Sequence, residues 1–348
     1  MMQRALVVAV ETNEIGDAID AELSELEALA NAAGAQVLER IVQRRASVDP
    51  ATLVGSGKAH EIALRAAELD AKIVITLNDL RPRQRKNLES IVPLPIVDRT
   101  MLILDVFARQ ARSREGKLQV ELAQLRYRQS NLIGVGADLS RLGGGIGTRG
   151  PGETKLEVDR RRITARIAVL NRMLADVRRH RALRRSAERR EPLVALVGYT
   201  NAGKSSLLNA LTRAGALVAD RPFATLDPLI RRAYLKPGFY VRLADTVGFI
   251  TDLPKDLVNA FRATLEELRD ADLLLHVIDA SSPRQLEQRR AVEGILHDLE
   301  LDRAPRLIVY NKSDLPAAER PEVETIQVSA RTGAGLERLR DAICERFS

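Results

Sequence analysis

The chain has 348 residues, a net charge of +7 at pH 7 and 45% hydrophobic residues, which is enough material for two or three domains with ordinary cores. Aromatic residues make up only 3% of the sequence and tryptophan is absent, so recognition of single strands by base stacking is not the leading expectation. One cysteine, Cys344, excludes an internal disulfide, and no apolar run approaches the roughly 18 residues of a membrane span, so we expect a cytoplasmic protein without a membrane span. Nothing in the sequence requires a dimer, so a monomer is expected.

The positive charge is concentrated in the middle of the chain. Residues 111–190 carry 20 Lys and Arg against 8 Asp and Glu, whereas residues 1–110 and 191–348 are slightly acidic. A local excess of this size is typical of a surface that binds a polyanion, with nucleic acid as the first candidate and a membrane surface as the second. The changes in charge near residues 110 and 190 coincide with the domain boundaries that we predict, which give three domains at 1–110, 111–190 and 191–348.

Residues 1–110 alternate between strand-like and helix-like stretches. Short apolar runs predict strands, and apolar residues at helical spacing predict helices between them. Such alternation favours a parallel sheet covered by helices, so we predict a small N-terminal α/β domain. The predicted strands are 6–10, 36–42, 73–76 and 96–97, and the predicted helices are 17–33, 60–69 and 82–91.

A short Gly-Lys stretch in this domain, Leu53-Val-Gly-Ser-Gly-Lys-Ala59, is similar to the end of a phosphate-binding loop. It departs from the full pattern, because Thr52 stands where the first glycine belongs and Ala59 stands where Ser or Thr should follow the lysine. We favour a turn that leads into a helix. The alternative is a weak second nucleotide site.

Two long helical stretches follow, at 101–127 and 163–183, each with apolar residues at helical spacing. Two amphipathic helices in succession are expected to pack as an antiparallel pair. Their polar faces are rich in arginine, which suits bidentate contacts with phosphate, so we favour nucleic-acid binding over an ordinary solvated face. These arginines are Arg160, Arg161, Arg162, Arg166, Arg172, Arg178, Arg179, Arg181, Arg184 and Arg185.

A glycine-rich loop, residues 142–153, separates the two helices. Glycine at this density is not expected to hold a helix or a strand. Two interpretations of the loop are equally supported by its spacing. It is either a flexible linker, or a tip of small residues, accompanied by Arg141 and Arg149, that enters a narrow cavity in a nucleic acid.

The segment 191–348 opens with a complete phosphate-binding pattern, Gly198-Tyr-Thr-Asn-Ala-Gly-Lys-Ser205. The apolar run 193–197 before it predicts a buried strand, and 206–211 after it predicts a helix, which is the context that this loop requires. Backbone N–H groups freed by glycine wrap a phosphate, and Lys204 reaches the outer phosphates. The Ser205 hydroxyl is a ligand for Mg²⁺.

Three further motifs follow in order. Thr225, in the loop 221–228, is expected to close over the γ-phosphate and Mg²⁺. Asp245 of Asp245-Thr-Val-Gly248 is expected to hold the Mg²⁺ shell, and the Gly248 N–H to contact the γ-phosphate. Asp314 of Asn311-Lys-Ser-Asp314 is an acceptor for the N1–H and 2-amino donors of guanine, which selects GTP over ATP.

The predicted site combines these motifs with the loop after 326–327, whose Ser329 and Ala330 backbone contacts the base. The catalytic candidates are Lys204, Thr225 and Gly248, and the Mg²⁺ ligands are Ser205, Thr225 and Asp245. The nucleotide contacts are Gly198, Tyr199, Thr200, Asn201, Ala202, Gly203, Lys204, Ser205, Ser206, Phe223, Ala224, Thr225, Asp245, Thr246, Val247, Gly248, Asn311, Lys312, Asp314, Ser329, Ala330 and Arg331.

Three other residues bear on the chemistry. Phe249 occupies the position at which many GTP-hydrolysing proteins carry a glutamine that orients water, so a partner or another residue has to complete the site. The Asn201 amide oxygen either coordinates a K⁺ ion beside the phosphates or simply shapes the loop. His276, in the strand-like run 273–279, is predicted to be a core histidine with its hydrogen bonds satisfied.

On these residues the whole chain resembles the HflX family of translational GTPases. The resemblance implies an α/β fold made of an N-terminal parallel α/β domain, a long antiparallel α-helical hairpin and a C-terminal Ras-like P-loop GTPase domain. It rests on Gly143-Gly-Gly-Ile-Gly-Thr-Arg-Gly-Pro-Gly-Glu-Thr154, Leu156-Glu-Val-Asp-Arg-Arg161, Gly198–Ser205, Phe223-Ala-Thr-Leu-Asp-Pro228, Asp245-Thr-Val-Gly-Phe-Ile250 and Val54-Gly-Ser-Gly-Lys58.

The resemblance also implies a function. It implies binding of GTP and GDP with Mg²⁺, and favours K⁺ at Asn201. It implies association with the large ribosomal subunit through the hairpin and its glycine-rich loop against ribosomal RNA, GTPase stimulation by ribosomes, and splitting or rescue of stalled ribosomes under stress. Some members carry a further C-terminal domain, so binding is expected ahead of splitting. Some use ATP through the N-terminal domain, and an RNA-remodelling ATPase is therefore the alternative function.

Overall fold

The computed structural model describes residues 2–12, 19–142, 151–188, 191–212, 223, 229–251, 268–318 and 325–347. Its contacts gather the chain into two compact units. Unit 1 comprises residues 1–109 and 120–173, and unit 2 comprises residues 110–119 and 174–348. Because both long helices are divided between the units, the predicted domain boundaries at 110 and 190 stay a prediction.

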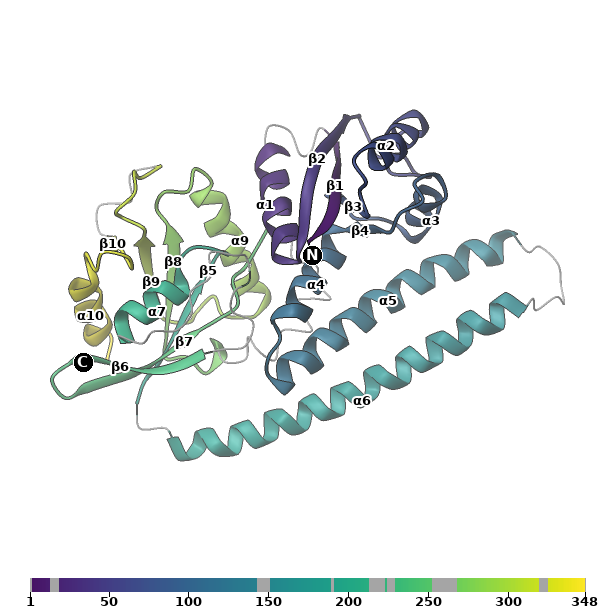
Figure 1. Ribbon diagram of the computed structural model, residues 1–348. Helices are drawn as coiled ribbons and strands as arrows, with labels where there is room; N and C mark the ends of the chain where they lie inside the picture. Colours follow the sequence, from purple (N-terminus) through teal and green to yellow (C-terminus); the bar gives the residue numbers. More distant parts are fainter. Residues whose placement is uncertain are drawn as a thin grey trace. The chain divides into compact units, whose positions relative to one another are not determined.

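Unit 1 contains a four-stranded sheet with the order β2-β1-β3-β4, in which every neighbouring pair is parallel (Figure 1). The middle of β1 is completely buried, as expected for a strand covered on both faces. The predicted parallel α/β domain is therefore confirmed. The strands are β1 (Gln3–Glu11), β2 (Ala35–Arg44), β3 (Ile73–Thr76) and β4 (Ile96–Asp98), and the helices are α1 (Ile19–Ala32), α2 (Ser56–Glu68) and α3 (Pro82–Ile91).

The helix predicted at 101–127 is two helices, α4 (Arg99–Gln110) and α5 (Arg114–Leu142). Ser113 begins the second, because its Oγ accepts a hydrogen bond from the Gly116 N–H at 2.9 Å, as an N-cap does. The apolar residues keep their helical spacing across this break, so the single predicted helix was wrong for a reason that periodicity does not reveal.

The hairpin consists of α5 and α6 (Pro151–Glu188), and their parts in unit 1 run antiparallel side by side, as predicted (Figure 1). Arg166 Nε donates to Glu121 Oε1 at 2.7 Å, and Gln129 Nε2 donates to Thr164 Oγ1 at 2.9 Å. The irregular loop predicted at 142–153 is shorter at both ends. The structure has Leu142 in α5 and starts α6 at Pro151, where the fixed φ of proline suits a first helical residue, and residues 143–150 lie outside the described part.

Unit 2 contains a six-stranded sheet with the order β10-β9-β8-β5-β7-β6, parallel except for the β6–β7 pair. This is the expected P-loop GTPase fold, with β5 fully buried at its centre. The strands are β5 (Leu193–Gly198), β6 (Leu229–Lys236), β7 (Phe239–Asp245), β8 (Leu273–Asp279), β9 (Arg306–Asn311) and β10 (Ile326–Gln327), and the helices are α7 (Lys204–Thr212), α9 (Gln285–Asp298) and α10 (Leu336–Glu345).

His276 of β8 is a core residue, but it is not satisfied as predicted. Only 1% of the residue is exposed, and its Nδ1 has no hydrogen-bond partner among the described residues. Burial lowers the pKa of His276 to about 3, so the ring is neutral at physiological pH. Among the helices of the described ranges, none is long and apolar enough to cross a membrane.

Candidate functional site

The phosphate-binding loop follows β5 and requires glycine at two positions. A Cβ on Gly198 would lie 2.3 Å from the Val277 carbonyl oxygen of the neighbouring strand β8. Gly203 has a φ of +88°, and a Cβ there would lie 2.2 Å from Asn311 Nδ2. Asn201, between them, also adopts a left-handed φ of 61°, which asparagine tolerates better than most residues. The loop is thus closely fitted to two other strands.

Lys204 is buried at the N-terminus of α7. Its Nζ donates hydrogen bonds to the Gly198 carbonyl at 3.1 Å and to the Tyr199 carbonyl at 2.9 Å. Burial lowers its pKa to about 8, while the charge of Asp245 acts in the opposite direction. A Cβ on Gly248 would lie 3.1 Å from Nζ, so the cation lies between the phosphate-binding loop and the Asp245–Gly248 motif.

The carboxyl ends of β5 and β7 bring the hydroxyl and carboxylate of the predicted Mg²⁺ site together. Ser205 Oγ donates to Asp245 Oδ2 at 2.5 Å, and only 1% of Asp245 is exposed. The next residue, Thr246, is fixed by a hydrogen bond of 2.6 Å from its Oγ1 to the Leu196 carbonyl. An alcohol oxygen and a carboxylate oxygen at one point are ligand types that Mg²⁺ prefers.

The residues after Gly248 are bonded directly to the phosphate-binding loop. The Thr200 N–H donates to the Phe249 carbonyl at 2.7 Å, and the Phe249 N–H donates to the Gly198 carbonyl at 3.1 Å. Phe249 is buried, with 2% exposed. The Tyr199 hydroxyl lies 2.8 Å from Thr251 Oγ1, a link that the sequence does not predict because no motif pairs these two side chains.

Asn311 connects the third motif to both neighbouring loops. Its Nδ2 donates to the Ala202 carbonyl at 2.9 Å, and its Oδ1 accepts from the Ala330 N–H at 3.1 Å. The side chain is buried, with 2% of the residue exposed, so these bonds are shielded from water. Asn311 therefore holds the phosphate-binding loop and the 329–331 loop at a fixed separation.

Asp314 is held as a carboxylate. The Ser329 hydroxyl donates to its Oδ1 at 2.6 Å and lowers its pKa, and Arg331 Nη2 lies 2.6 Å from its Oδ2. Beside it, Lys312 Nζ lies 2.7 Å from Asp279 Oδ2 in a salt bridge that the motif alone does not predict. An acidic residue at the end of β8, next to the strand that carries Asn311, was the available signal.

The remaining predicted residues divide into two groups. Phe223 is buried with a φ of 57°, Val247 is buried, and Ser206 lies in the first turn of α7. Ala224 and Thr225 lie outside the described residues, so the structure neither brings them to the site nor removes them from it.

The incomplete Gly-Lys stretch of unit 1 has different surroundings. It leads into α2, as the favoured interpretation expected. Lys58 Nζ donates to Glu61 Oε1 at 2.8 Å on the surface, and Ala59 is completely buried in the core. A Cβ on Gly57 would meet no atom within 4 Å, whereas the Gly55 N–H donates to Gln43 Oε1 of β2 at 2.9 Å, so β2 contacts the start of this turn and its lysine end is open.

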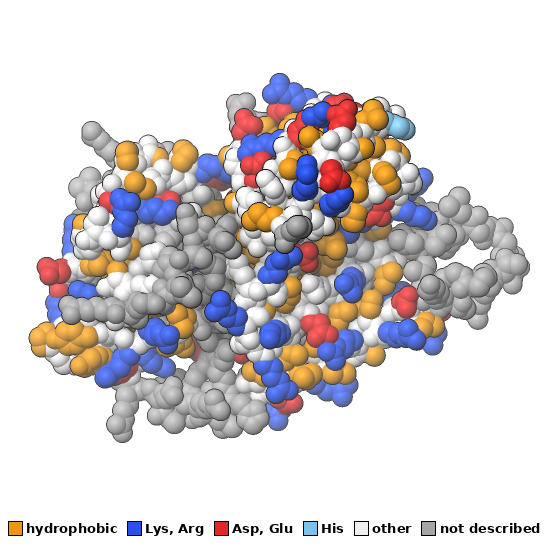
Figure 2. Space-filling view, viewed as in Figure 1, with side chains coloured by type: hydrophobic (Ala, Val, Ile, Leu, Met, Phe, Trp, Pro, Cys, Tyr) orange, Lys and Arg blue, Asp and Glu red, His pale blue; other side chains and the backbone are white. Residues whose placement is uncertain are grey.

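The arginine-rich face of α6 is exposed where its side chains are described. Figure 2 shows the Lys and Arg side chains along α5 and α6, with fewer acidic ones. Arg161, Arg162 and Arg179 are between 73% and 79% exposed, and within the described part of the chain they pair with acidic residues of their own helix, at spacings of three or four. Surface pairs of this kind are weak, so these guanidinium groups remain accessible to a phosphate. The described arginines of the predicted set are Arg160, Arg161, Arg162, Arg166, Arg172 and Arg179.

Comparison with known proteins gives matches along the whole chain. Residues 20–108 match the family "GTP-binding GTPase N-terminal", residues 110–188 match "GTP-binding GTPase Middle Region" and residues 193–312 match "50S ribosome-binding GTPase". The GTPase HflX of Caldanaerobacter subterraneus subsp. tengcongensis is 51% identical, covering 98% of this chain and 80% of the relative. The GTPase HflX of Escherichia coli is 45% identical, covering 94% and 79%.

A solved structure supports the fold. A GTP-binding protein from Sulfolobus solfataricus, crystallised in complex with GDP, covers 99% of this chain at 24% identity with a TM-score of 0.50. Among the described residues, the phosphate-binding loop, the Asp245–Gly248 motif and the Asn311–Asp314 motif are joined through Asn311, Ser205 and the Phe249 backbone into one continuous site. The relatives extend over nearly the full chain at an identity that establishes the family. The chain therefore belongs to the HflX family of GTPases, binds guanine nucleotides and hydrolyses GTP.

Proposed function

We propose that this GTPase is a switch that acts on the large ribosomal subunit in the cytoplasm and splits or rescues stalled ribosomes under stress. The observation that carries the proposal is the combination, in one chain, of a continuous nucleotide site with a long helix that has six exposed arginines among its described residues. Arginine suits the phosphates of ribosomal RNA, and the match to a 50S ribosome-binding family supports the same partner.

We propose that the nucleotide lies along the loop Gly198–Ser206. The first N–H groups of α7 have no partner of their own within the helix, so they are donors for phosphate oxygens, with the Lys204 ammonium between them and Gly248. Asp314 pairs with the guanine edge, supported by Ser329, Ala330 and Arg331. Contacts from Asn201, Phe223, Ala224, Thr225, Thr246, Val247, Asn311 and Lys312 complete the proposed set.

The proposed metal ligands are Ser205, Asp245 and Thr225. The hydroxyl and carboxylate of the first two meet directly in a hydrogen bond of 2.5 Å, and a small separation of the two oxygens would let one Mg²⁺ ion take both. When bound, Mg²⁺ supplies positive charge to the phosphates. Asn201, exposed at the left-handed turn of the loop, is the proposed ligand for K⁺.

Hydrolysis is proposed to depend on the ribosome. Phe249 carries no polar side-chain atom and is buried, so it cannot orient the attacking water. The missing group is then supplied by the large subunit, which couples GTP hydrolysis to ribosome binding. GTP-dependent ordering of the Thr225 and Gly248 segments favours the bound state, and hydrolysis releases it.

The test is GTP turnover in potassium buffer with and without purified large ribosomal subunits, with sodium buffer as the control for Asn201. We expect strong stimulation by the subunits and a weaker rate in sodium. Equal turnover with and without subunits, alongside intact GTP binding, would remove the ribosome from the proposal.

A further inference from the structure

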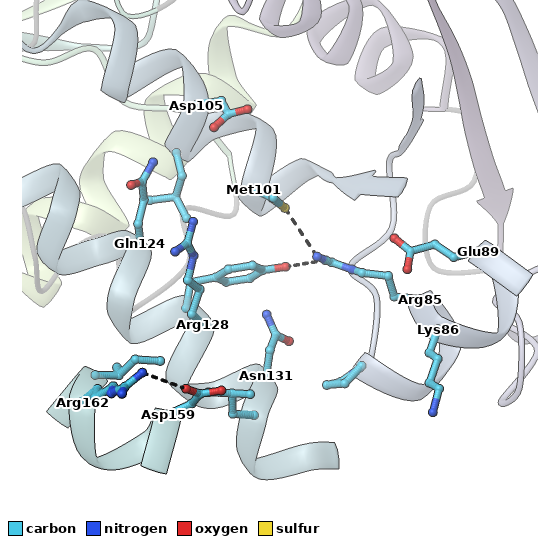
Figure 3. Close-up of a pocket in the computed structure, with 15 residues that line it drawn as sticks. Arg85, Lys86, Glu89, Met101, Asp105, Gln124, Arg128, Asn131, Asp159 and Arg162 are labelled. Atoms are coloured by element: carbon cyan, nitrogen blue, oxygen red, sulfur yellow. Dashed lines mark hydrogen bonds and ion pairs between the residues drawn. The ribbon is translucent and has the colours of Figure 1, made fainter. Parts of the chain in front are cut away.

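Unit 1 contains a pocket of about 530 Å³ that the nucleotide site does not explain. It lies between α3, α4, α5 and α6, and its volume is within the range of about 300–1,000 Å³ found for small-ligand sites. Figure 3 shows its lining residues. The apolar part of the lining consists of Pro82, Met101, Leu104, Leu132 and Ile163.

A fixed polar network forms one side of the pocket. The Tyr127 hydroxyl donates to Asp98 Oδ2 at 2.5 Å and accepts from Arg85 Nη2 at 2.7 Å, and Arg85 Nη2 also lies 2.6 Å from Asp98 Oδ2. Asp98 is buried, with 1% exposed. Burial and the nearby Asp98 charge raise the pKa of Tyr127, so the ring stays a neutral phenol. The aromatic ring of Tyr127 is therefore held in place before any ligand arrives.

One N–H group of Arg85 has only a weak hydrogen-bond acceptor. Its Nη1 is directed at the Met101 sulfur at 3.4 Å (Figure 3), and a thioether is a weak acceptor. An anionic oxygen in the pocket would accept this N–H more strongly. A ligand with a phosphate or a similar oxyanion is thus favoured over a purely apolar one.

Cationic side chains outnumber carboxylates in the lining of the pocket, which favours an anion there. Arg85, Lys86, Arg128 and Arg162 line it together with three carboxylates, Glu89, Asp105 and Asp159. Arg162 Nη1 lies 4.0 Å from Asp159 Oδ1 (Figure 3), and burial raises the pKa of Asp105, while Arg109 and Arg128 act in the opposite direction. Gln124 and Asn131 add amide groups, which carry both donors and acceptors, as the edges of nucleobases do.

We propose that this pocket receives one unpaired nucleotide of the RNA that binds α5 and α6. This inference rests on the proposed function, since it assigns a specific contact to the same RNA partner. The base packs against Tyr127 and the apolar lining, the amides of Gln124 and Asn131 meet its edge, and Arg85 and Arg128 hold the phosphate. RNA is favoured as the source because Arg162 of the lining continues the exposed arginine row of α6, which a longer polyanion contacts at several points.

The first test measures the affinity of the full chain, with GTP present, for a labelled uridine hexaribonucleotide by fluorescence anisotropy. Arg128→Gln removes an exposed pocket cation and is expected to weaken binding about tenfold. Arg172→Gln is the matched control, because it removes an exposed arginine of α6 outside the pocket and is expected to cost at most about threefold. Equal losses in the two variants would overturn the pocket as a distinct contact.

A second measurement locates the base and is independent of folding effects at Arg128. The chain has no tryptophan, so Leu132→Trp places a single fluorophore in the pocket lining and Val169→Trp places one on the exposed face of α6. We expect the hexamer to quench only the first, and a duplex RNA to quench neither. Quenching of both variants, or quenching by uridine monophosphate at the same concentration as by the hexamer, would contradict an RNA nucleotide in the pocket.

Co-sedimentation of the wild-type chain with large ribosomal subunits separates the two proposals. Binding to the subunits without a pocket-specific effect in the hexamer assay would overturn this inference and leave the proposed function in place. If the wild-type chain does not co-sediment with the large subunits, the proposed function itself is overturned.

Discussion

Two turns of this chain contain Gly-Lys, one in the loop Gly198–Ser205 and one in the stretch Leu53–Ala59, and each leads into a helix. The contacts of the lysine and of the residue after it differ between the two turns. In the loop Gly198–Ser205 the lysine is buried and donates to two carbonyls of its own loop, and the following serine donates to Asp245. In Leu53–Ala59 the lysine pairs with Glu61 on the surface, and the residue after it is a buried alanine. A Cβ would collide with Asn311 at Gly203 and with nothing at Gly57.

The difference shows what a phosphate site requires beyond its own letters. The complete loop is closed by the side chains of Asp245 and Asn311 and by the Val277 backbone carbonyl, and these fix the loop around the space for the phosphates. The incomplete loop also leads into a helix and is contacted by Gln43 of β2, but its lysine pairs with Glu61 and no hydroxyl follows it. A helix N-terminus attracts anions, and the surrounding side chains then decide whether it becomes a site.

The strongest way to break this comparison is to remove each lysine in turn. Lys204→Ala deletes the cation beside the phosphates, and we expect GTP hydrolysis to fall by about 100-fold or more, the loss typical of one transition-state contact. Lys58→Ala removes only a surface pair with Glu61, and its GTPase rate should match the wild type. Phosphate release with saturating large subunits measures both, and a substantial loss in Lys58→Ala would mean that the two loops are not functionally distinct.

The base-binding end gives the next largest effect. Asp314→Asn replaces a carboxylate that accepts two guanine donors with an amide, and we expect GDP to bind about 10–100 times more weakly. An amide donates to the 2-oxo group of xanthine, so the variant should gain affinity for xanthosine diphosphate. Asp302→Asn, which makes the same charge change at an exposed aspartate paired with His297, is the control. Unchanged GDP affinity in Asp314→Asn would place the base elsewhere.

Alanine substitutions at Gly203 and Gly57 test the same difference between the two loops through the free energy of unfolding. Gly203→Ala forces a Cβ into Asn311 at a φ of +88°, and we expect a loss of about 1–3 kcal/mol in the free energy of unfolding. Gly57→Ala lies in the first turn of α2 with open space around it, and we expect a gain of up to about 1 kcal/mol. Urea unfolding of both variants measures the difference, and a similar change in the two would show that Gly203 is not constrained by Asn311.

The smallest expected effect is the pH dependence that Lys204 gives the nucleotide-free protein. Its folded pKa of about 8 lies below the unfolded value, so the unfolded chain binds more protons above pH 8 and stability rises with pH there. From pH 8 to 9 this contributes about 1 kcal/mol, and Lys204→Met should remove it. The measurement is the urea midpoint of the wild type minus that of Lys204→Met, followed from pH 8 to 9, and we expect this difference to rise with pH. A fall in the difference would contradict a buried ammonium whose charge destabilises the folded protein.

The sequence predicts the bounds of those helices and strands whose apolar residues form a run with clear ends. The expected bounds of β3, α3 and β8 are those observed, because their apolar runs end at polar or turn-forming residues. It does not predict β6, an edge strand in which only Ala233 and Leu235 are buried, so its apolar signal is weak. It also joins α4 to α5, since their apolar spacing continues past the Ser113 cap.

For the site, three of the four motifs, at Gly198, Asp245 and Asn311, lie at the ends of the strands β5, β7 and β9 as the sequence predicts, because parallel strands direct their carboxyl ends to one edge of the sheet, and the Thr225 motif stays a prediction. It does not predict how the motifs are joined. The Asn311 bonds to Ala202 and Ala330, and the pairing of Lys312 with Asp279, link residues that are distant in sequence. Such pairs depend on strand order and register, which local patterns do not contain.

The central claim is that the loop Gly198–Ser205 is the single guanine-nucleotide site of this chain, and the stoichiometry of GDP binding tests it most directly. Calorimetric titration with Mg²⁺ present should give one GDP per wild-type chain, one per Lys58→Ala chain and a large loss of binding in Lys204→Ala. Two GDP per wild-type chain, or a loss of binding in Lys58→Ala, would contradict the account.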